Sequence, residues 1–480
     1  MKRKIRNGFL YLGIMGLAIS GCQSADQKQH TADETASQQE VDRQEKHKKK
    51  QDKKEIWIEN PLSEKDRAYV EGQSQMNNGE SEMYLNAIVP CEPLNLTREQ
   101  KLEDFDFFWN TIRDKVYCLE EDFAAAGIDY EAYIAGFREQ AAQNENDYEF
   151  WRILEDSKQM CRGWHINLVS PYSALIESLN DVGEINMIRK TTGDEQKRKL
   201  KYWDVLLSQN DYQYKSSRQK MLMAEPMPEL KIIDDQTAVI TVPTFGYATQ
   251  MEKAGNLYIE YMKQVSDYEN VIFDLKGNRG GISRFLYHNL IAPNIDEPLN
   301  STNLRFFKMG KDIADTELIP ATEGGPWTYQ FGYRKDTIYA SAPLSELPKE
   351  LEIENSDYGN ADYFVRTDFS VLPRYDHKIL KGNLWVLTYP ENYSAAEEFV
   401  SLCKDTGFAT LVGKQTKGDG GGGMALRFVL PNSGLIGSVQ SLWTLNEDGT
   451  NNSIEGTKPD LESPEGETPL ETCLKAIEES

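Results

Sequence analysis

The strongest constraint on the fold is a pair of apolar runs, each followed by a turn of unusual composition. Residues 271–275 are apolar apart from Asp274, and the turn Gly277-Asn278-Arg279-Gly280-Gly281 follows them. Residues 384–387 form the second run, and Ser394 follows it where an apolar helical pattern begins. Short runs of this kind are typical of strands buried in a parallel sheet. Because sites form where such strands end, we expect the glycine pair and Ser394 to meet.

The surrounding pattern predicts an α/β core behind a helical region. Strand-like and helical segments alternate after residue 230, which favours a largely parallel sheet. The expected strands are 231–233, 238–242, 270–275, 384–387 and 410–412, and the expected helices are 249–267, 282–292 and one from Ser394. A polar and aromatic insertion covers about 295–380, as a lid or a decorated loop, and a hairpin is expected at about 426–444. The core is therefore expected over 231–480.

Helical periodicity marks the region before the core. The spacing of apolar residues predicts helices over 97–116, 130–142 and 148–161, and Thr97 and Gln100 have the spacing of a capping box. We expect a mainly helical region over 93–230.

The N-terminus has the pattern of an export signal. A basic start is followed by an apolar stretch over 9–19 that is too short to span a bilayer, and then by Ile19-Ser20-Gly21-Cys22. This string resembles a bacterial lipobox, which implies a signal peptide over 1–22 and a lipid anchor on Cys22 at the extracytoplasmic face of the cell membrane. An ordinary secretory signal with a chance cysteine is the alternative. Residues 23–92 are polar and charged, so we expect a disordered tether.

Composition excludes several classes of function. The net charge of −24 leaves no basic stripe to neutralise phosphates, so no nucleic-acid partner is expected. No CxxC spacing is present, and we expect neither a metal nor a cofactor. The glycine-rich turn lacks both the Gly-Lys-Ser/Thr ending of a P-loop and GxGxxG spacing. If Cys22 carries lipid, five cysteines remain, and at least one of them is unpaired.

The two turns together predict acyl-transfer chemistry. A serine at a helix N-terminus lies in a positive field that favours developing negative charge. Backbone N–H groups of Gly280 or Gly281, with that of Ala395, are candidate donors to a tetrahedral oxyanion. Taken alone, Ser394 and Glu397 also have the spacing of a capping box, which is the structural alternative.

Four segments in order resemble the C-terminal-processing, or tail-specific, serine protease family. They are 274–281, Ser394-Ala395-Ala396-Glu397, 413–418 with Gly-x-x-Thr-x-Gly, and 456–460 with Gly-x-x-Pro-Asp. The resemblance implies a ClpP/crotonase-like core and a serine endopeptidase that cleaves peptides or proteins through an acyl-enzyme. Many members insert a PDZ domain, but 172–230 has no such pattern, so none is expected.

The general base is predicted from a departure within this pattern. One branch of the family uses a lysine shortly after Thr-x-Gly, and Asp419 stands at that position. Lys417 is two residues early, and a neighbouring carboxylate would hold it in the charged form. The tricorn-core-like branch uses an upstream histidine, and His165 in Cys161-Arg162-Gly163-Trp164-His165 matches its place. A structural histidine, or a metal held by Cys161 and His165, is the alternative.

The remaining histidines fit this role less well. They are His30 and His47 in the tether, His288 on an expected helix and His377 in a polar loop.

The third member of the site follows from the resemblance alone. The tricorn-like branch orients its histidine with a glutamate near the Pro-Asp motif, which implies Glu455 here. Glu447 and Asp460 are alternatives. That branch also has a serine just before its histidine, where this chain has Trp164. The expected site is Ser394, His165 and Glu455. A catalytically silent lipoprotein that binds peptides, retinoids or lipids on the same fold is the competing hypothesis.

Overall fold

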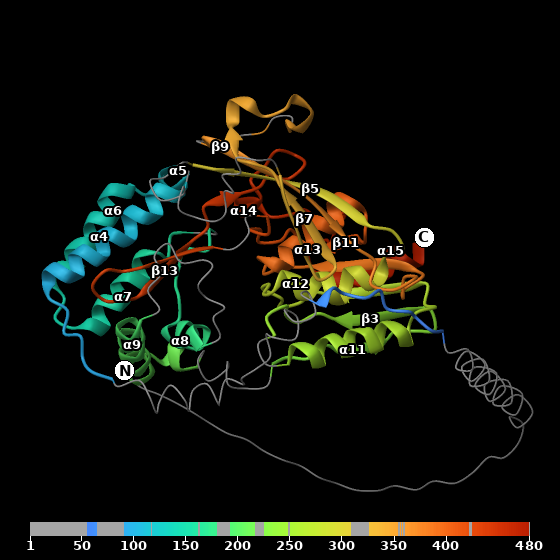
Figure 1. The fold of residues 1–480 in the computed structure, drawn as a ribbon, viewed down its shortest axis with the longest axis horizontal. Helices are drawn as coiled ribbons and strands as arrows, with labels where there is room; N and C mark the ends of the chain where they lie inside the picture. The colour runs from blue at the N-terminus through green and yellow to red at the C-terminus, as the bar shows by residue number, and fades with distance from the viewer. Residues whose placement is uncertain are drawn as a thin grey trace, which may run out of the picture. The chain divides into compact units, whose positions relative to one another are not determined.

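The chain was studied as a computed structural model (Figure 1). It divides into two units, Met1–Ile56 and Trp57–Ser480, and every element below belongs to the second. The structure describes 55–64, 91–116, 118–161, 164–179, 193–216, 225–247, 250–308, 326–353, 356, 358, 361–421 and 425–479. The expected signal peptide, Cys22, His30 and His47 lie outside these residues. Within them, no helix combines the length and apolar character needed to cross a bilayer.

A largely parallel sheet forms the core, as the alternating pattern predicts. Its strands are β2 (Leu230–Ile232), β3 (Thr237–Thr241), β4 (Asn270–Asp274), β10 (Asn383–Thr388), β11 (Thr410–Gly413) and β15 (Leu461–Glu462). They lie in the order β15-β11-β10-β4-β3-β2, and only β2 is antiparallel to its neighbour. The carboxyl ends of β4, β10 and β11 therefore share one edge.

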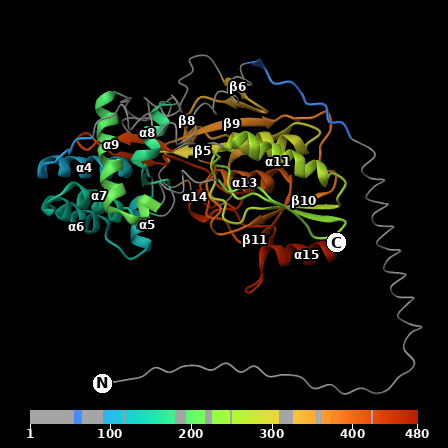
Figure 2. The ribbon, with the colours of Figure 1, turned by 90° about the horizontal axis from the view of Figure 1, so that it is seen from below.

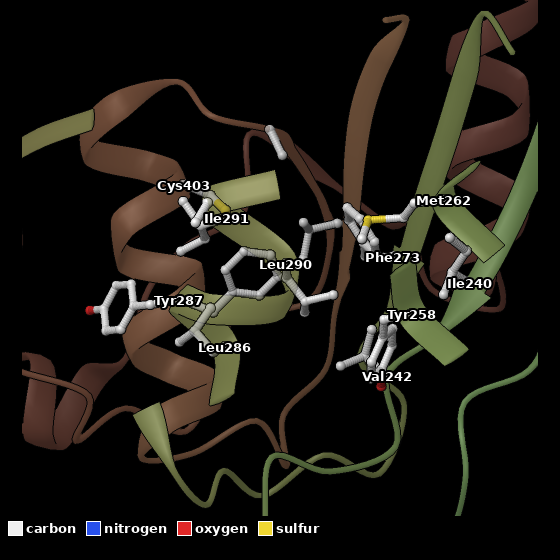
Figure 3. Packing of buried hydrophobic residues seen from close by; sticks show 14 of the residues in the cluster. Ile240, Val242, Tyr258, Met262, Phe273, Leu286, Tyr287, Leu290, Ile291 and Cys403 are labelled. Atoms are coloured by element: carbon white, nitrogen blue, oxygen red, sulfur yellow. The ribbon is translucent and has the colours of Figure 1, made fainter. Parts of the chain in front are cut away.

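Helices cover both faces of this sheet because apolar side chains point alternately to each side (Figure 2). Ile240 and Phe273 point to a core shared with one set of helices, shown in Figure 3. Val239 and Ile272 point to the other face, where Cys473 of the last helix is buried. The helical elements are α11 (Met251–Gln264), α12 (Ser283–Leu286), η3 (Tyr287–Ile291), η4 (Ala292–Asn294) and α13 (Ala395–Thr406) on the first face, and α15 (Pro469–Glu479) on the second.

The N-terminal region is helical, as predicted. Its helices are α4 (Arg98–Lys115), α5 (Leu119–Ala125), α6 (Tyr130–Gln143), α7 (Asp147–Ser157), α8 (Pro171–Leu179) and α9 (Asp194–Asn210). The capping box of Thr97 and Gln100 is present at the start of α4. Phe108 of α4 is fully buried and packs on Phe428, so this region shares a hydrophobic cluster with the C-terminal hairpin.

The predicted C-terminal hairpin joins the helical region to the core. It consists of β12 (Leu426–Val429) and β13 (Ile436–Val439), and β13 also pairs with the short strand β1 (Asn167–Leu168). Figure 1 shows β13 beside the helices α4 and α7. The buried carboxylate of Asp104 on α4 accepts hydrogen bonds from the N–H groups of Asn432 (2.8 Å) and Ser433 (2.7 Å) at its turn. The hairpin is thus fixed to the first helix.

The insertion at 295–380 forms an antiparallel sheet. The sequence had left two interpretations of it, a lid and a decorated loop. Its elements are β5 (Leu299–Phe307), β6 (Trp327–Phe331), β7 (Arg334–Ile338), β8 (Ala342–Pro343), the short helical turns η6 (Leu344–Glu346) and η7 (Lys349–Leu351), and β9 (Tyr363–Val371). The strands lie in the order β14-β5-β9-β7-β6, with β8 against β9, and β14 (Leu442–Trp443) comes from the C-terminal part of the chain. The short helix α14 (Asn452–Glu455) follows β14.

Part of the predicted tether is ordered. Glu59 pairs with Tyr375 as an isolated antiparallel bridge, and Arg374 Nε donates to Glu59 Oε1 at 3.0 Å. The hydroxyl of Tyr333 donates to the Asn60 carbonyl at 2.9 Å. The ordered chain therefore begins before residue 93, because the segment around Glu59 finds backbone and ionic partners on the core.

Candidate active site

Ser394 lies between β10 and α13, at the carboxyl edge of the parallel sheet. It is the N-cap residue of α13, with φ 57° and ψ −125°, and its side chain makes no capping hydrogen bond. Glu397 is fully buried and accepts from Asn452 Nδ2 (2.7 Å) and Thr457 Oγ1 (2.5 Å). The capping-box alternative is therefore wrong, and the Ser394 hydroxyl remains available.

His165 reaches this hydroxyl from the helical region. Its Nε2 lies 3.3 Å from Ser394 Oγ. The hairpin fixes its backbone, since Ser438 Oγ donates to the His165 carbonyl at 2.8 Å and the Gln440 N–H donates to the Trp164 carbonyl at 2.5 Å. The candidate base and the candidate nucleophile, which are far apart in the sequence, therefore lie within hydrogen-bonding reach.

Asp419 occupies the place expected for Glu455. Its Oδ2 lies 2.5 Å from His165 Nδ1, and its side chain is fully shielded from solvent. Ser453 Oγ donates to Oδ1 at 3.1 Å, and the Asp419 N–H donates to the Asn452 carbonyl at 3.2 Å. The prediction for Glu455 was wrong: its side chain is exposed, while α14 supports the site through the two residues named above.

Tyr393 completes the set of contacts around this pair. Its hydroxyl donates to Asp419 Oδ2 at 2.6 Å and accepts from the His165 backbone N–H at 3.3 Å. Its ring lies 4.7 Å from the imidazole, centre to centre. Burial raises the pKa of Tyr393, and the Asp419 carboxylate raises it further, so the phenol stays protonated and acts as a donor. Sequence patterns gave no signal for this residue beyond its place next to Ser394.

Backbone strain is concentrated at this site. Positive φ values at non-glycine residues are uncommon and cost free energy. Among the described residues they occur at Asn95, Trp164, His165, Ser394 and Asp419. The nucleophile candidate, its histidine and the acid are all in this set. Local strain of this kind is typical of functional sites, where the surrounding structure imposes the backbone conformation.

The three predicted oxyanion donors are not equivalent. Gly280 has φ 95°, and a Cβ there would lie 2.9 Å from Ser394 Cβ and 2.8 Å from the Ala395 nitrogen. The Gly280 N–H donates to Asn278 Oδ1 at 2.8 Å, so it is engaged and serves close approach instead.

Two N–H groups remain available. The Phe245 N–H donates to the Gly280 carbonyl, and the Ile282 N–H donates to the Phe245 carbonyl. Because successive residues of an extended segment point to alternate sides, the Gly281 N–H points away from Phe245. Neither it nor the Ala395 N–H donates to another described residue.

The other candidate bases, Lys417, His288 and His377, make no hydrogen bond or ion pair with Ser394 or Asp419 in the described part of the chain. Lys417 is exposed, and its Nζ lies 4.9 Å above the Tyr393 ring. His288 is in contact with Tyr333, and burial lowers its pKa to about 3. His377 pairs with Asp376 at 2.9 Å on the surface.

The described residues do not support a metal site at His165. Burial raises the pKa of Cys161 to about 12, which keeps it a thiol and a poor ligand. No group of three or more His, Cys, Asp or Glu side chains in the described ranges could hold a metal ion.

Sequence comparison shows which family has this arrangement of segments. Residues 236–463 match the model described as peptidase family S41. The core of this chain, over residues 236–463, belongs to peptidase family S41. It is a serine-type peptidase with the mixed helix and sheet core of that family. The matched residues contain β4, β10 and β11 with Gly280, Ser394 and Asp419, whereas His165 lies outside them. No curated protein matches the sequence.

Several solved structures are similar to this chain at low identity. Mature CPAF is 13% identical, with 80% of this chain and 95% of that chain covered and a TM-score of 0.45. A lipoprotein from Streptococcus agalactiae is 12% identical, covering 79% and 96%, with a TM-score of 0.42. The tricorn protease is 14% identical, covering 80% and 37%, with a TM-score of 0.36.

Proposed function

We propose that this S41 peptidase cleaves peptides or proteins internally, through an acyl-enzyme formed on Ser394. His165 is the general base and Asp419 the acid that orients it, in the role that the sequence assigned to Glu455. The observation that carries the proposal is the continuous contact from Ser394 Oγ to His165 Nε2 (3.3 Å) and from Nδ1 to Asp419 Oδ2 (2.5 Å).

The chemistry follows from these atoms. Ser394 Oγ attacks the scissile carbonyl carbon while His165 Nε2 takes the hydroxyl proton. The oxyanion that forms is held by the N–H groups of Ala395 and Gly281, and one such donor is worth about 3 kcal/mol in the transition state. His165 then gives the proton to the leaving amine as the C–N bond breaks, leaving an ester on Ser394. Water, deprotonated by His165, hydrolyses that ester.

The mechanism is tested by three alanine substitutions assayed on a fluorogenic peptide library. Ser394→Ala and His165→Ala are expected to abolish turnover, and Lys417→Ala is expected to retain it. The reverse pattern, with Lys417 essential and His165 dispensable, would contradict the histidine mechanism. A serine-directed fluorophosphonate supplies a second readout. If the folded protein is not labelled at Ser394, a ligand-binding protein on the same fold replaces the enzyme.

We further propose that the peptidase is anchored by lipid on Cys22 at the extracytoplasmic face of the cell membrane. The support is the sequence Ile19-Ser20-Gly21-Cys22 after a basic and apolar stretch. Expression of the full chain with an alkyne fatty acid should label the wild type but not Cys22→Ala. Labelling that survives in Cys22→Ala would contradict the anchor without affecting the peptidase proposal.

A further inference from the structure

The short strand β1 lies at the edge of its sheet, two residues after His165. The order of that sheet is β1-β13-β12, so among the described strands β1 has a neighbour on one side only. Edge strands present N–H and C=O groups that are free to pair with an added chain. Because β1 begins two residues after His165, a peptide paired with its free edge would lie near the candidate active site.

The register shows which groups face the free side. Asn167 lies opposite Ser438 and Leu168 opposite Gly437, and the Val169 N–H donates to the Ile436 carbonyl at 2.8 Å. In an antiparallel pair, residues alternate between hydrogen-bonded and non-bonded positions. Because Val169 is bonded to the hairpin, Leu168 is not. Its N–H and C=O therefore point away from β13.

We propose that the substrate peptide binds in an extended conformation along this edge and pairs its main chain with Leu168. This inference rests on the proposed peptidase function and adds how the substrate is held. Leu168 lies three residues from His165, which is about 10 Å along an extended chain. The substrate residue that pairs with it therefore lies about two to four positions from the scissile bond.

Two features of β1 support a peptide as the occupant. The side chain of Asn167 is exposed and that of Leu168 is partly exposed, so the strand is accessible beside the site. Pro171 begins α8 shortly afterwards, so the edge is too short for a stable sheet between two copies of the chain. Main-chain pairing reads the extended shape of a peptide, and side chains add specificity only through their own pockets.

The first experiment measures binding of N-methylated peptides to the Ser394→Ala protein by fluorescence anisotropy. A cleaved peptide is prepared with one N-methyl group at each position in turn. Methylation of the residue that pairs with Leu168 is expected to raise Kd about five- to tenfold, since one hydrogen bond is lost. Methylation of its two neighbours, whose N–H groups point the other way, should change Kd less than twofold. Equal Kd values along the peptide would overturn the proposal.

The second experiment removes the N–H group of Leu168, which the proposal pairs with a carbonyl of the substrate. Leu168→Pro lacks the outward N–H, and proline is tolerated at a strand edge when its nitrogen faces away from the ladder. It should raise Kd about tenfold, and N-methylation should weaken binding further, because proline keeps the C=O that accepts from the substrate N–H. Leu168→Ala is the matched control, because it keeps the N–H. If both variants weaken binding equally, the side chain is responsible and main-chain pairing is wrong.

A third measurement does not depend on how Leu168→Pro folds. A photo-crosslinker placed at the methylation-sensitive position should label residues 164–170 of the Ser394→Ala protein. Crosslinks elsewhere would overturn the proposal, as would a concentration-dependent dimer that Leu168→Pro disrupts. If the wild type fails to hydrolyse peptides while the binding pattern holds, the proposed peptidase function is wrong and the binding edge stands.

Discussion

The Asp419 side chain contacts His165 and is shielded from solvent. We therefore expect its charge to have a large effect on turnover. Asp419→Asn keeps the size of the group but removes its charge and its preference for one histidine tautomer. We expect turnover to fall about 10⁴-fold with little change in KM. Steady-state kinetics on a peptide substrate would measure this. Glu455→Gln is the control and should stay within twofold of wild type; loss of activity there with Asp419→Asn spared would restore the assignment made from the sequence.

Tyr393 is a positioning residue, because its hydroxyl bridges Asp419 and the His165 backbone. Tyr393→Phe keeps the ring and removes both hydrogen bonds. We expect kcat to fall about tenfold while KM is unchanged, since one hydrogen bond to a charged group is lost inside the site. Tyr389→Phe is the control, because Tyr389 lies in the same loop between β10 and α13 but interacts with Asp274 at the end of β4. Equal losses of kcat in the two variants would contradict a specific role for Tyr393.

The contrast between Ser394 and Asp419 shows which residues a sequence can supply. Ser394, Ala395 and the glycine pair lie in local motifs, so their chemistry was predictable from spacing. Asp419 was visible only as a departure from a lysine, and its partner His165 lies far upstream. The sequence showed that an acid stands where one branch of the family has its lysine. Whether that acid contacts the histidine depends on the direction that the Thr416–Gly418 turn gives to its side chain. Glu455 was predicted from the family resemblance, which placed the acid at the end of α14 instead.

At the scale of elements, the antiparallel insertion is joined to the catalytic helix by a buried ionic network. Arg334 of β7 lies 2.7 Å from both Glu398 of α13 and Asp336, and its side chain is 14% exposed. Tyr287 also donates to Glu398, at 2.5 Å. Sequence patterns placed the insertion but not its sheet, because antiparallel pairing between β5, β7 and β9 depends on contacts distant in the chain.

Arg334→Met leaves two carboxylates unpaired in this network. We expect the free energy of unfolding to fall by about 3 kcal/mol, because an uncompensated buried charge is costly. Urea unfolding followed by fluorescence would measure it. Arg366→Met is the matched control: Arg366 pairs with Asp368 two residues on at 2.8 Å, but the pair is 36% and 30% exposed. That variant should lose less than about 1 kcal/mol. Equal losses would mean that burial of the network does not matter.

For the whole molecule, carboxyl groups whose pKa differs between the folded and the unfolded chain set the pH dependence of stability. Desolvation of the Asp405 carboxyl, together with the charges of Glu447 and Glu397, raises its pKa to about 6. The unfolded chain releases this proton near pH 4, whereas the folded chain keeps it until about pH 6. Between these values the folded state binds more protons than the unfolded state. Stability therefore falls as the pH rises through this window.

Asp405→Asn should remove that loss. Its free energy of unfolding in urea is expected to exceed that of wild type by about 1 kcal/mol at pH 7.5, because solvent screens part of the effect, and to equal it near pH 4. Asp448→Asn is the control of opposite sign. Hydrogen bonds from Thr450 and Lys458 lower the pKa of Asp448 to about 2, so its contribution is present above pH 4 and is lost on acidification. A gain from Asp405→Asn that persists at pH 4 would contradict the linkage.

The division of the site between distant segments also determines when the molecule acquires it. His165 belongs with the helices and is held by Ser438, while Ser394 and Asp419 come from the core. A ribosome therefore releases the histidine long before the nucleophile, and the residues that fix its backbone come later still. A growing chain contains no complete site until the residues up to Ser438 have been made and packed. The order of synthesis therefore delays peptidase activity until the hairpin has packed against His165.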